Sequence, residues 1–354
     1  MPSAGKPSEI HSGHGSAFSC AQETREHGVL GMTPHRRNFL QLGAGAAVLA
    51  AMTRLARALD YPTRPVHLIE GFGAGGAPDV VARLIGQALS ERLGQSLVIE
   101  NRTGSASNIA ADHVARATPD GYTLLLLTTA NAINATMYRL SFDPIRDLVP
   151  VASVCQAPLV MEVNPSVPAR TVAEFVAYAK ANPGRINLAS AGVGSITHVT
   201  GEMFKTMAGL DLFHVPYRGA QVFPALFSGE AQVYFGPLLS SIGYIRAGNL
   251  RALAVTSTTR SPELPDVAAL NETLAGFEAT SWYGIAAPRD TPAEIIATLS
   301  AAVGASLADD KLQARFAHIG AAVLPGSSAD FAKLIAEETK KWGKVVVTAN
   351  LKAN

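Results

Sequence analysis

The chain has 354 residues, which suits two domains of ordinary size better than one. Hydrophobic residues make up 48% of it and charged residues 16%, so a disordered or collagen-like chain is excluded. The formal net charge of +1 argues against a nucleic-acid partner, because such proteins normally carry a clear basic excess. The two cysteines, Cys20 and Cys155, are too few for a disulfide framework or a metal-binding cysteine cluster.

Residues 36–58 have the features of an export signal. Arg36 and Arg37 precede a weakly hydrophobic run at 42–52, and Ala56-Arg57-Ala58 matches a small-x-small cleavage pattern. Twin arginines before such a run resemble a Tat signal, and the run is shorter than the roughly 20 residues of a membrane span. We therefore expect residues 1–58 to be an extension plus export signal, cleaved near Ala58. The mature protein would be periplasmic, without a membrane span. The alternative is an amphipathic first helix of the fold.

Beyond residue 60, short apolar runs alternate with stretches of helical periodicity. In chain order we expect a strand at 66–70, a helix at 78–93, a strand at 97–100, a helix at 105–117 and a buried strand at 122–127. This alternation predicts an α/β fold with parallel sheets covered on both faces. Two later sequences match a capping box and so predict helix starts, namely Thr171 to Glu174 and Thr291 to Glu294.

Two apolar segments, 157–163 and 282–287, are candidates for chain crossings between domains. Two crossings imply one discontinuous domain, with residues 59–158 and 284–354 together and residues 159–283 inserted. The predicted fold is therefore two doubly wound lobes with a ligand cleft between them.

A glycine-rich segment, residues 71–76, follows the first expected strand and satisfies G-x-G-x-x-G. Glu100 lies near the place of a ribose-binding acid, so a dinucleotide site is one interpretation and a plain turn is another. We favour an anion-binding loop. Glycines free backbone N–H groups, and a helix N-terminus adds about half a positive charge. Pro78 also starts this helix later than a dinucleotide fingerprint does.

Two further loops also follow expected strands. Residues 190–198 hold Ser190 and Ser195 as hydroxyl donors and His198 in a first helical turn, where we expect it to be packed rather than ligating. Residues 126–134 end the third strand in small polar side chains. Because ligands of open α/β sheets sit beyond the carboxyl ends of strands, the three loops are predicted to converge on one pocket.

Apart from the glycine-rich segment, the sequence lacks the common catalytic and metal-binding motifs. It contains no HExxH, CxxC, P-loop or G-x-S-x-G sequence, and its nine histidines are scattered. We therefore expect a protein that is not an enzyme and holds no metal and no cofactor.

Several phrases of the chain occur together, in the same order, in one known family. They are Gly75-Gly76-Ala77-Pro78-Asp79, Glu100-Asn101-Arg102, His214-Val215-Pro216-Tyr217-Arg218-Gly219 and Trp282-Tyr283-Gly284. The chain thereby resembles the periplasmic substrate-binding proteins of tripartite tricarboxylate transporters, the Bug family. The resemblance implies a fold like that of type II periplasmic binding proteins. It also implies capture of a small carboxylate (a di- or tricarboxylate or an aromatic acid) by lobe closure. The partner would be a membrane permease, or alternatively a signalling protein.

The resemblance also implies which residues contact the ligand. An alternative role for Asp79 is only to stabilise the N-terminus of its helix. The sequence Phe235-Gly236-Pro237 stands where the family often has an aspartate, so an amino-bearing ligand is less expected. The implied ligand-binding residues are Phe72, Gly73, Ala77, Asp79, Thr129, Asn131, Ser190, Gly192, Ser195 and His198.

Overall fold

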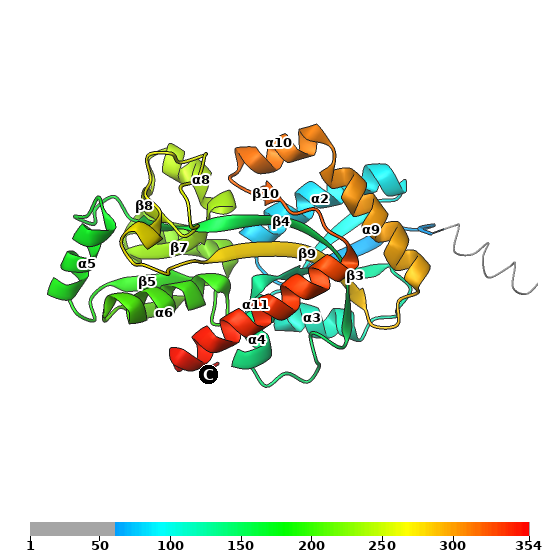
Figure 1. Cartoon of the computed structure of the whole chain (residues 1–354), viewed down its shortest axis with the longest axis horizontal. Helices are drawn as coiled ribbons and strands as arrows, with labels where there is room; N and C mark the ends of the chain where they lie inside the picture. The colour runs from blue at the N-terminus through cyan, green and yellow to red at the C-terminus, as the bar shows by residue number, and fades with distance from the viewer. Residues whose placement is uncertain (1–60, 354) are drawn as a thin grey trace, which may run out of the picture. The chain divides into compact units, whose positions relative to one another are not determined.

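The computed structural model describes residues 61–353 (Figure 1). The expected export signal at 36–58 and its cleavage site lie outside the described residues. Within 61–353, no helix is both long enough and apolar enough to span a bilayer. The strands are β1 (Val66–Glu70), β2 (Leu97–Asn101), β3 (Thr123–Thr128), β4 (Leu148–Val163), β5 (Asn187–Ser190), β6 (Phe213–Pro216), β7 (Val233–Pro237), β8 (Arg251–Val255), β9 (Thr280–Pro288) and β10 (Ala322–Val323).

The helices alternate with these strands along most of the chain, as expected. They are α2 (Ala77–Leu93), α3 (Asn108–Ala115), α4 (Thr129–Met137), α5 (Val172–Ala181), α6 (Ile196–Ala208), α7 (Val222–Ser228), α8 (Leu238–Arg246), α9 (Ala293–Leu307), α10 (Asp310–His318) and α11 (Ser328–Thr348). We call β1–β3 with α2–α4, α9 and α10 the first lobe, and β5–β8 with α5–α8 the second lobe.

The strands form one hydrogen-bonded network in the order β2-β1-β3-β9-β4-β7-β5-β6. Pairing is parallel among β1, β2 and β3 and again among β5, β6 and β7, which confirms the predicted parallel sheets there. The prediction is wrong for β4 and β9, which run antiparallel to each other and to their neighbours. The two supposed crossings, 157–163 and 282–287, are parts of these long strands. Helices still flank these strands along the chain, with α4 and α5 around β4 and α9 after β9, so the alternation of strand and helix did not reveal their antiparallel pairing.

The β4 strand serves both lobes. Its residues 148–158 pair with β9, and its residues 159–163 pair with β7 and β8. The fold is thus a mixed α/β architecture with two lobes, as predicted, joined by paired strands rather than by loops.

Period-two alternation of apolar side chains builds the first lobe. Leu68 and Leu124 pack against α2 and α9, while the next residues, Ile69 and Leu125, pack on the opposite face with α3 and Phe331 of α11. The second lobe is built in the same way. Leu188 of β5 faces α5 and α6, and the neighbouring Ala189 faces α7. Both sheets are therefore covered on both faces.

The last long helix, α11, packs against both lobes (Figure 1). Phe331 and Ile335 in its first half belong to the core of the first lobe. Trp342 and Val346, two turns later, belong to the core of the second lobe, together with Phe204 of α6. Hydrophobic burial along one helix thus ties the two lobes together.

Two helix starts differ from prediction and one agrees. Residues 105–107, expected to be α-helical, form a 3₁₀ turn with positive φ, and α3 begins only at Asn108. At the second capping sequence, Thr291 donates its hydroxyl to the Pro288 carbonyl instead of capping α9. The Thr171 hydroxyl does accept the Glu174 N–H at the start of α5, which confirms that cap.

Candidate functional site

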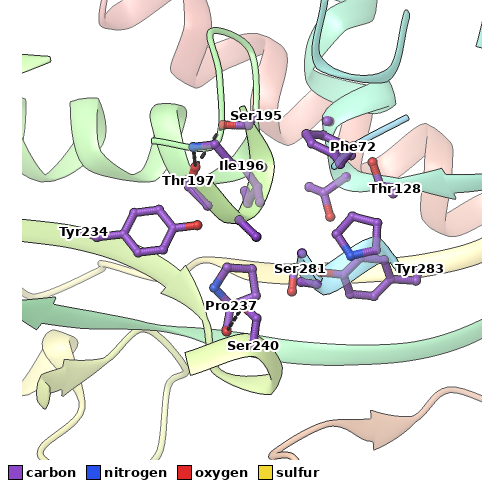
Figure 2. A pocket seen from close by; sticks show the side chains of 18 of the residues that line it. Phe72, Thr128, Ser195, Ile196, Thr197, Tyr234, Pro237, Ser240, Ser281 and Tyr283 are labelled. Atoms are coloured by element: carbon purple, nitrogen blue, oxygen red, sulfur yellow. Dashed lines mark hydrogen bonds between the residues drawn. The ribbon is translucent and has the colours of Figure 1, made fainter. Parts of the chain in front are cut away.

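A pocket lies between the loops of the two lobes (Figure 2). None of its described lining residues is Asp, Glu, Lys, Arg or His. The lining comes from residues 72, 76–78, 128–130, 191, 195–197, 219–220, 223, 234, 237, 240 and 281–283.

Four helices begin at the wall of this pocket. The first residues of α2, α4 and α6 line it from three loops, and α8 does so through Pro237 and Ser240. N–H groups in the first turn of a helix have no partner within the helix, and each N-terminus carries about half a positive charge. The four N-termini therefore bring partial positive charge to a pocket wall that has no cationic side chain among its described lining residues.

The amides of the first loop are mostly used inside the loop. The Phe72 N–H donates to Glu70 Oε2 at 2.7 Å, the Gly75 N–H to Asp79 Oδ2 at 2.9 Å and the Gly76 N–H to the Gly73 carbonyl at 3.1 Å. The Phe72 ring, by contrast, lines the pocket. Among the described residues, none accepts a hydrogen bond from the Ala77 N–H in the first turn of α2, so this amide is available to a ligand.

Asp79 and Glu70 form a buried network beneath that loop. Asp79 accepts two hydrogen bonds from Arg83, both at 2.9 Å, and one from Asn101 at 3.0 Å. Burial raises the pKa of Asp79, but these donors and the Gly75 N–H outweigh it, so the net shift is downward. Burial raises the pKa of Glu70 to about 8, against hydrogen bonds from Phe72 and Asn101. Both carboxyl groups hold the loop in shape from behind the pocket wall.

The second loop presents the N-terminus of α6. The Ser195 hydroxyl accepts the His198 N–H at 3.3 Å and donates to the Gly192 carbonyl at 2.6 Å, which makes Ser195 the N-cap. The Thr197 hydroxyl accepts the Ala191 N–H at 2.9 Å. In the described part of the chain, the Ile196 and Thr197 N–H groups have no acceptor. They lie in the pocket wall, so they are the free donors of this loop.

Behind this loop, two histidines stack with their ring centres 4.1 Å apart. Burial lowers the pKa of His198 to about 3, helped by His214 and Lys205, and burial with Lys205 lowers that of His214 to about 4. The Ser190 hydroxyl lies 2.7 Å from His214 Nε2. His198 does not line the pocket; its ring stacks on His214, and its Nδ1 accepts the Gly194 N–H.

The third loop ends β3 and starts α4. The Thr129 hydroxyl accepts the Trp282 N–H at 2.9 Å and so fixes α4 to β9. Asn131 Oδ1 accepts the Thr128 N–H at 3.0 Å. Its Nδ2 is buried and, among residues 61–353, has no acceptor.

A profile of the tripartite tricarboxylate transporter receptor family, TctC, matches residues 81–351. The chain belongs to this family. It is 33% identical to the protein BugT of Bordetella pertussis over 319 residues, which cover 87% of this chain and 97% of that one. A solved R. palustris protein with adipate, Rpa4515, is 37% identical, with a TM-score of 0.81. That match covers 83% of this chain and 99% of the other. MatC from Rhodopseudomonas palustris, solved with bound malate, is 31% identical, with a TM-score of 0.78. It covers 81% of this chain and 100% of that one.

In this TctC receptor, the ten residues implied by the resemblance fall into three groups. Phe72, Ala77, Thr129 and Ser195 line the pocket. Gly73 and Gly192 line a wider hollow next to it, which shares Phe72, Ala191 and Gly219 with the pocket and which we call the vestibule. The remaining four line neither the pocket nor the vestibule and make the internal hydrogen bonds or ring contacts described above, namely Asp79, Asn131, Ser190 and His198.

The two lobes touch on either side of the vestibule. The Tyr138 hydroxyl donates to the Val193 carbonyl at 2.9 Å. A Cβ added to Gly219 would lie 2.8 Å from the Gly73 nitrogen, so these two backbones are in direct contact. The pocket therefore lies behind a closed seam between the lobes.

Sequence reasoning missed the pocket residues contributed by β7, α8 and β9. Figure 2 shows Tyr234 reaching in from β7, Tyr283 from the other side and Ser240 from the first turn of α8. The same rule about strand ends would have found α8, since it follows β7 directly. The rule does not find Tyr283, because β9 is antiparallel to its neighbours and lines the pocket with residues 281–283, near its amino end and not at its carboxyl end.

One cluster has ligand atoms close enough together for a metal ion. The nearest such atoms of His198, Glu202 and His214 lie within 4.8 Å of one another. The two imidazole planes are only 27° apart, so both rings cannot direct a lone pair at one ion without rotating. Glu202 is also paired with Lys205 at 2.9 Å, and His198 Nδ1 accepts the Gly194 N–H. The arrangement therefore does not fit a metal.

Proposed function

We propose that this receptor captures a small carboxylate in the pocket and that helix N-termini bind the anionic group. The observation that supports this is the convergence of four helix N-termini on a pocket with no charged side chain among its described lining residues. Such ends bind anions through N–H groups and the helix dipole. They avoid the large desolvation cost of a buried lysine or arginine. The lack of a lining carboxylate also disfavours ligands with an ammonium group.

The remainder of the wall favours a compact ligand with an apolar middle. Phe72, Phe223 and Trp282 supply aromatic surface, and the hydroxyl of Tyr234 points into the pocket (Figure 2). A short di- or tricarboxylate or an aromatic acid matches this mixture. The adipate and malate present in the two solved relatives support a dicarboxylate.

We assign the ligand contacts to Phe72, Ala77, Thr129 and Ser195 from the sequence, together with Ile196, Thr197 and Tyr234 from the structure. Gly73, Gly192 and Asn131 stay candidates for contacts through water. Asp79, Ser190 and His198 act by shaping the loops. The receptor is a binding protein and not an enzyme in this proposal, since no described group in the pocket wall could act as a general acid or base other than hydroxyls.

In this proposal one lobe comprises residues 59–158 and 284–354, and the other comprises residues 159–283. The two lobes would close on the ligand in the periplasm. The closed form would then dock on the permease subunits of a tripartite tricarboxylate transporter. The family membership and the contacts between Gly73 and Gly219 support this sequence of events.

The test is a thermal-shift screen of the protein against mono-, di- and tricarboxylates, aromatic acids and nicotinamide cofactors. A ligand at about 100 times its Kd stabilises the folded state by about 2.7 kcal/mol, so a cognate carboxylate should raise the Tm by several degrees. Calorimetric titration of each hit then gives its Kd. Shifts with NAD or NADP alone, or with no carboxylate in the screen, would contradict the proposal.

A further inference from the structure

A second buried glutamate, Glu162, lies behind the opposite wall of the pocket. Its exposed fraction is 0%, and it sits in β4 directly across from Tyr234 of β7. Its Oε1 accepts the hydroxyl of Ser241, in the first turn of α8, at 2.7 Å. A Cβ on Gly236 would come within 2.6 Å of the carboxyl group, of Ser241 and of the Tyr234 ring, so this glycine makes room for the carboxyl group. Glu162 thus touches the two elements that bring Tyr234 and the N-terminus of α8 to the pocket.

Among residues 61–353, no cationic side chain pairs with Glu162. In β4 it is the only charged residue, and Tyr234 is the titratable group that faces it from β7. From β8, Arg251 donates to the carbonyls of Val167 and Ala169, and from α8, Arg246 pairs with Glu263. Glu162 Oε2 has no hydrogen-bond partner within the described chain. An ionised carboxylate here would be buried without a counter-ion, which is very costly.

We infer that Glu162 is a positioning residue that must stay uncharged for the ligand to bind. As a neutral acid it holds the first turn of α8 and Tyr234 in place. As a carboxylate it would put a negative charge behind a wall that receives an anion. The part of this inference that concerns the ligand rests on the proposed function. The part that concerns the uncharged state of Glu162 rests on its burial and its contacts.

The direction of the pKa agrees with this geometry. Burial raises the pKa of Glu162 to about 8, against the hydrogen bond from Ser241. Burial also holds the pKa of Tyr234 above its ordinary value, so Tyr234 does not titrate near neutral pH. Ligand affinity should therefore be constant below pH 7 and fall above pH 8. If only the neutral form binds, the Kd at pH 9.5 should be about 30 times that at pH 7.

The experiment measures the Kd of the best carboxylate from the screen between pH 6.5 and pH 9.5, where the ligand stays ionised. The wild-type chain is compared with Glu162→Gln, which mimics the neutral acid, and with Glu294→Gln, which alters an exposed glutamate. We expect Glu162→Gln to bind within about 3-fold of wild type at pH 7 and to keep that Kd at pH 9.5. The Glu294→Gln variant should follow the wild-type profile. A wild-type Kd that does not change with pH would overturn the inference. A Glu162→Gln variant whose affinity still falls above pH 8 would also overturn it and would point to Glu70 as the titrating group.

A ligand-free measurement separates this inference from the proposed function. In the unfolded chain Glu162 loses its proton near its ordinary pKa of about 4.5, while in the folded chain it keeps the proton to about pH 8. The folded state therefore binds more protons in this window, and stability falls as pH rises from 5 to 8. The fall in Tm should be smaller in Glu162→Gln than in wild type. An equal fall would show that Glu162 is ionised in the fold, even if no carboxylate were found to bind.

Discussion

Replacing Gly219 with alanine is expected to weaken carboxylate binding by about 5- to 150-fold, the equivalent of about 1–3 kcal/mol of steric overpacking. The added methyl group would lie 2.8 Å from the Gly73 nitrogen and 3.1 Å from its Cα, and backbone cannot move aside as a flexible side chain can. The contact joins loops of the two lobes, so the variant should hold the seam apart. Calorimetric titration with the carboxylate found in the screen gives the change in Kd.

A control is needed because Gly219 also has a positive φ of 54°, at which any side chain is strained. Gly209 has a φ of 61° and nothing within 4 Å of an added Cβ. The Gly209→Ala variant should therefore lose stability from strain alone and keep the wild-type Kd. If both variants weaken binding equally, the seam between Gly73 and Gly219 does not control the pocket.

Replacing Trp342 with alanine should lower the free energy of unfolding by about 3–5 kcal/mol. Trp342 is fully buried in the core of the second lobe, and its indole N–H donates to Glu338 Oε2 at 2.8 Å. The same oxygen accepts the indole N–H of Trp282 in β9 at 3.1 Å. The variant removes a large side chain from a helix that packs on both lobes. Urea unfolding monitored by circular dichroism measures the change.

Val347 provides the matched control in the same helix, since 72% of its surface is exposed. The Val347→Ala variant should change the free energy of unfolding by less than about 0.5 kcal/mol. A loss for Trp342→Ala no larger than that of Val347→Ala would mean that the C-terminal half of α11 contributes little to the fold.

Local patterns in the sequence predicted most of the first lobe. The strand at 66–70 and the helix from 78 to 93 agree with β1 and α2 to within one residue. The signals used for them, the spacing of apolar residues and a proline in the first helical turn, depend only on residues close together in the chain. The convergence of three loops on one pocket also followed, since parallel strands end at one edge of a sheet.

Two kinds of feature were beyond local patterns. The antiparallel course of β4 and β9 depends on pairing between residues more than 100 positions apart, such as Gln156 with Trp282. Which amides of the first loop are free also depends on tertiary contacts. The glycine-rich pattern predicted N–H groups that point at a ligand, but the Phe72 N–H donates to the carboxyl group of Glu70. A spacing pattern shows which N–H groups exist, but only the tertiary structure shows where each one donates.

The pairing of β4 with its neighbours is irregular between Pro150 and Ala152, between Ser153 and Cys155 and between Met161 and Glu162. Such irregularities bend and twist a strand locally. Opening of the pocket would bend β4 together with β9 along their length. The lobes would not rotate about a single flexible point. The deformation would be shared among many backbone torsions, each changing little. The stiffness of the paired strands β4 and β9, whose pairing holds two of these three irregular points, would then limit how far the lobes part and how quickly bound solute escapes.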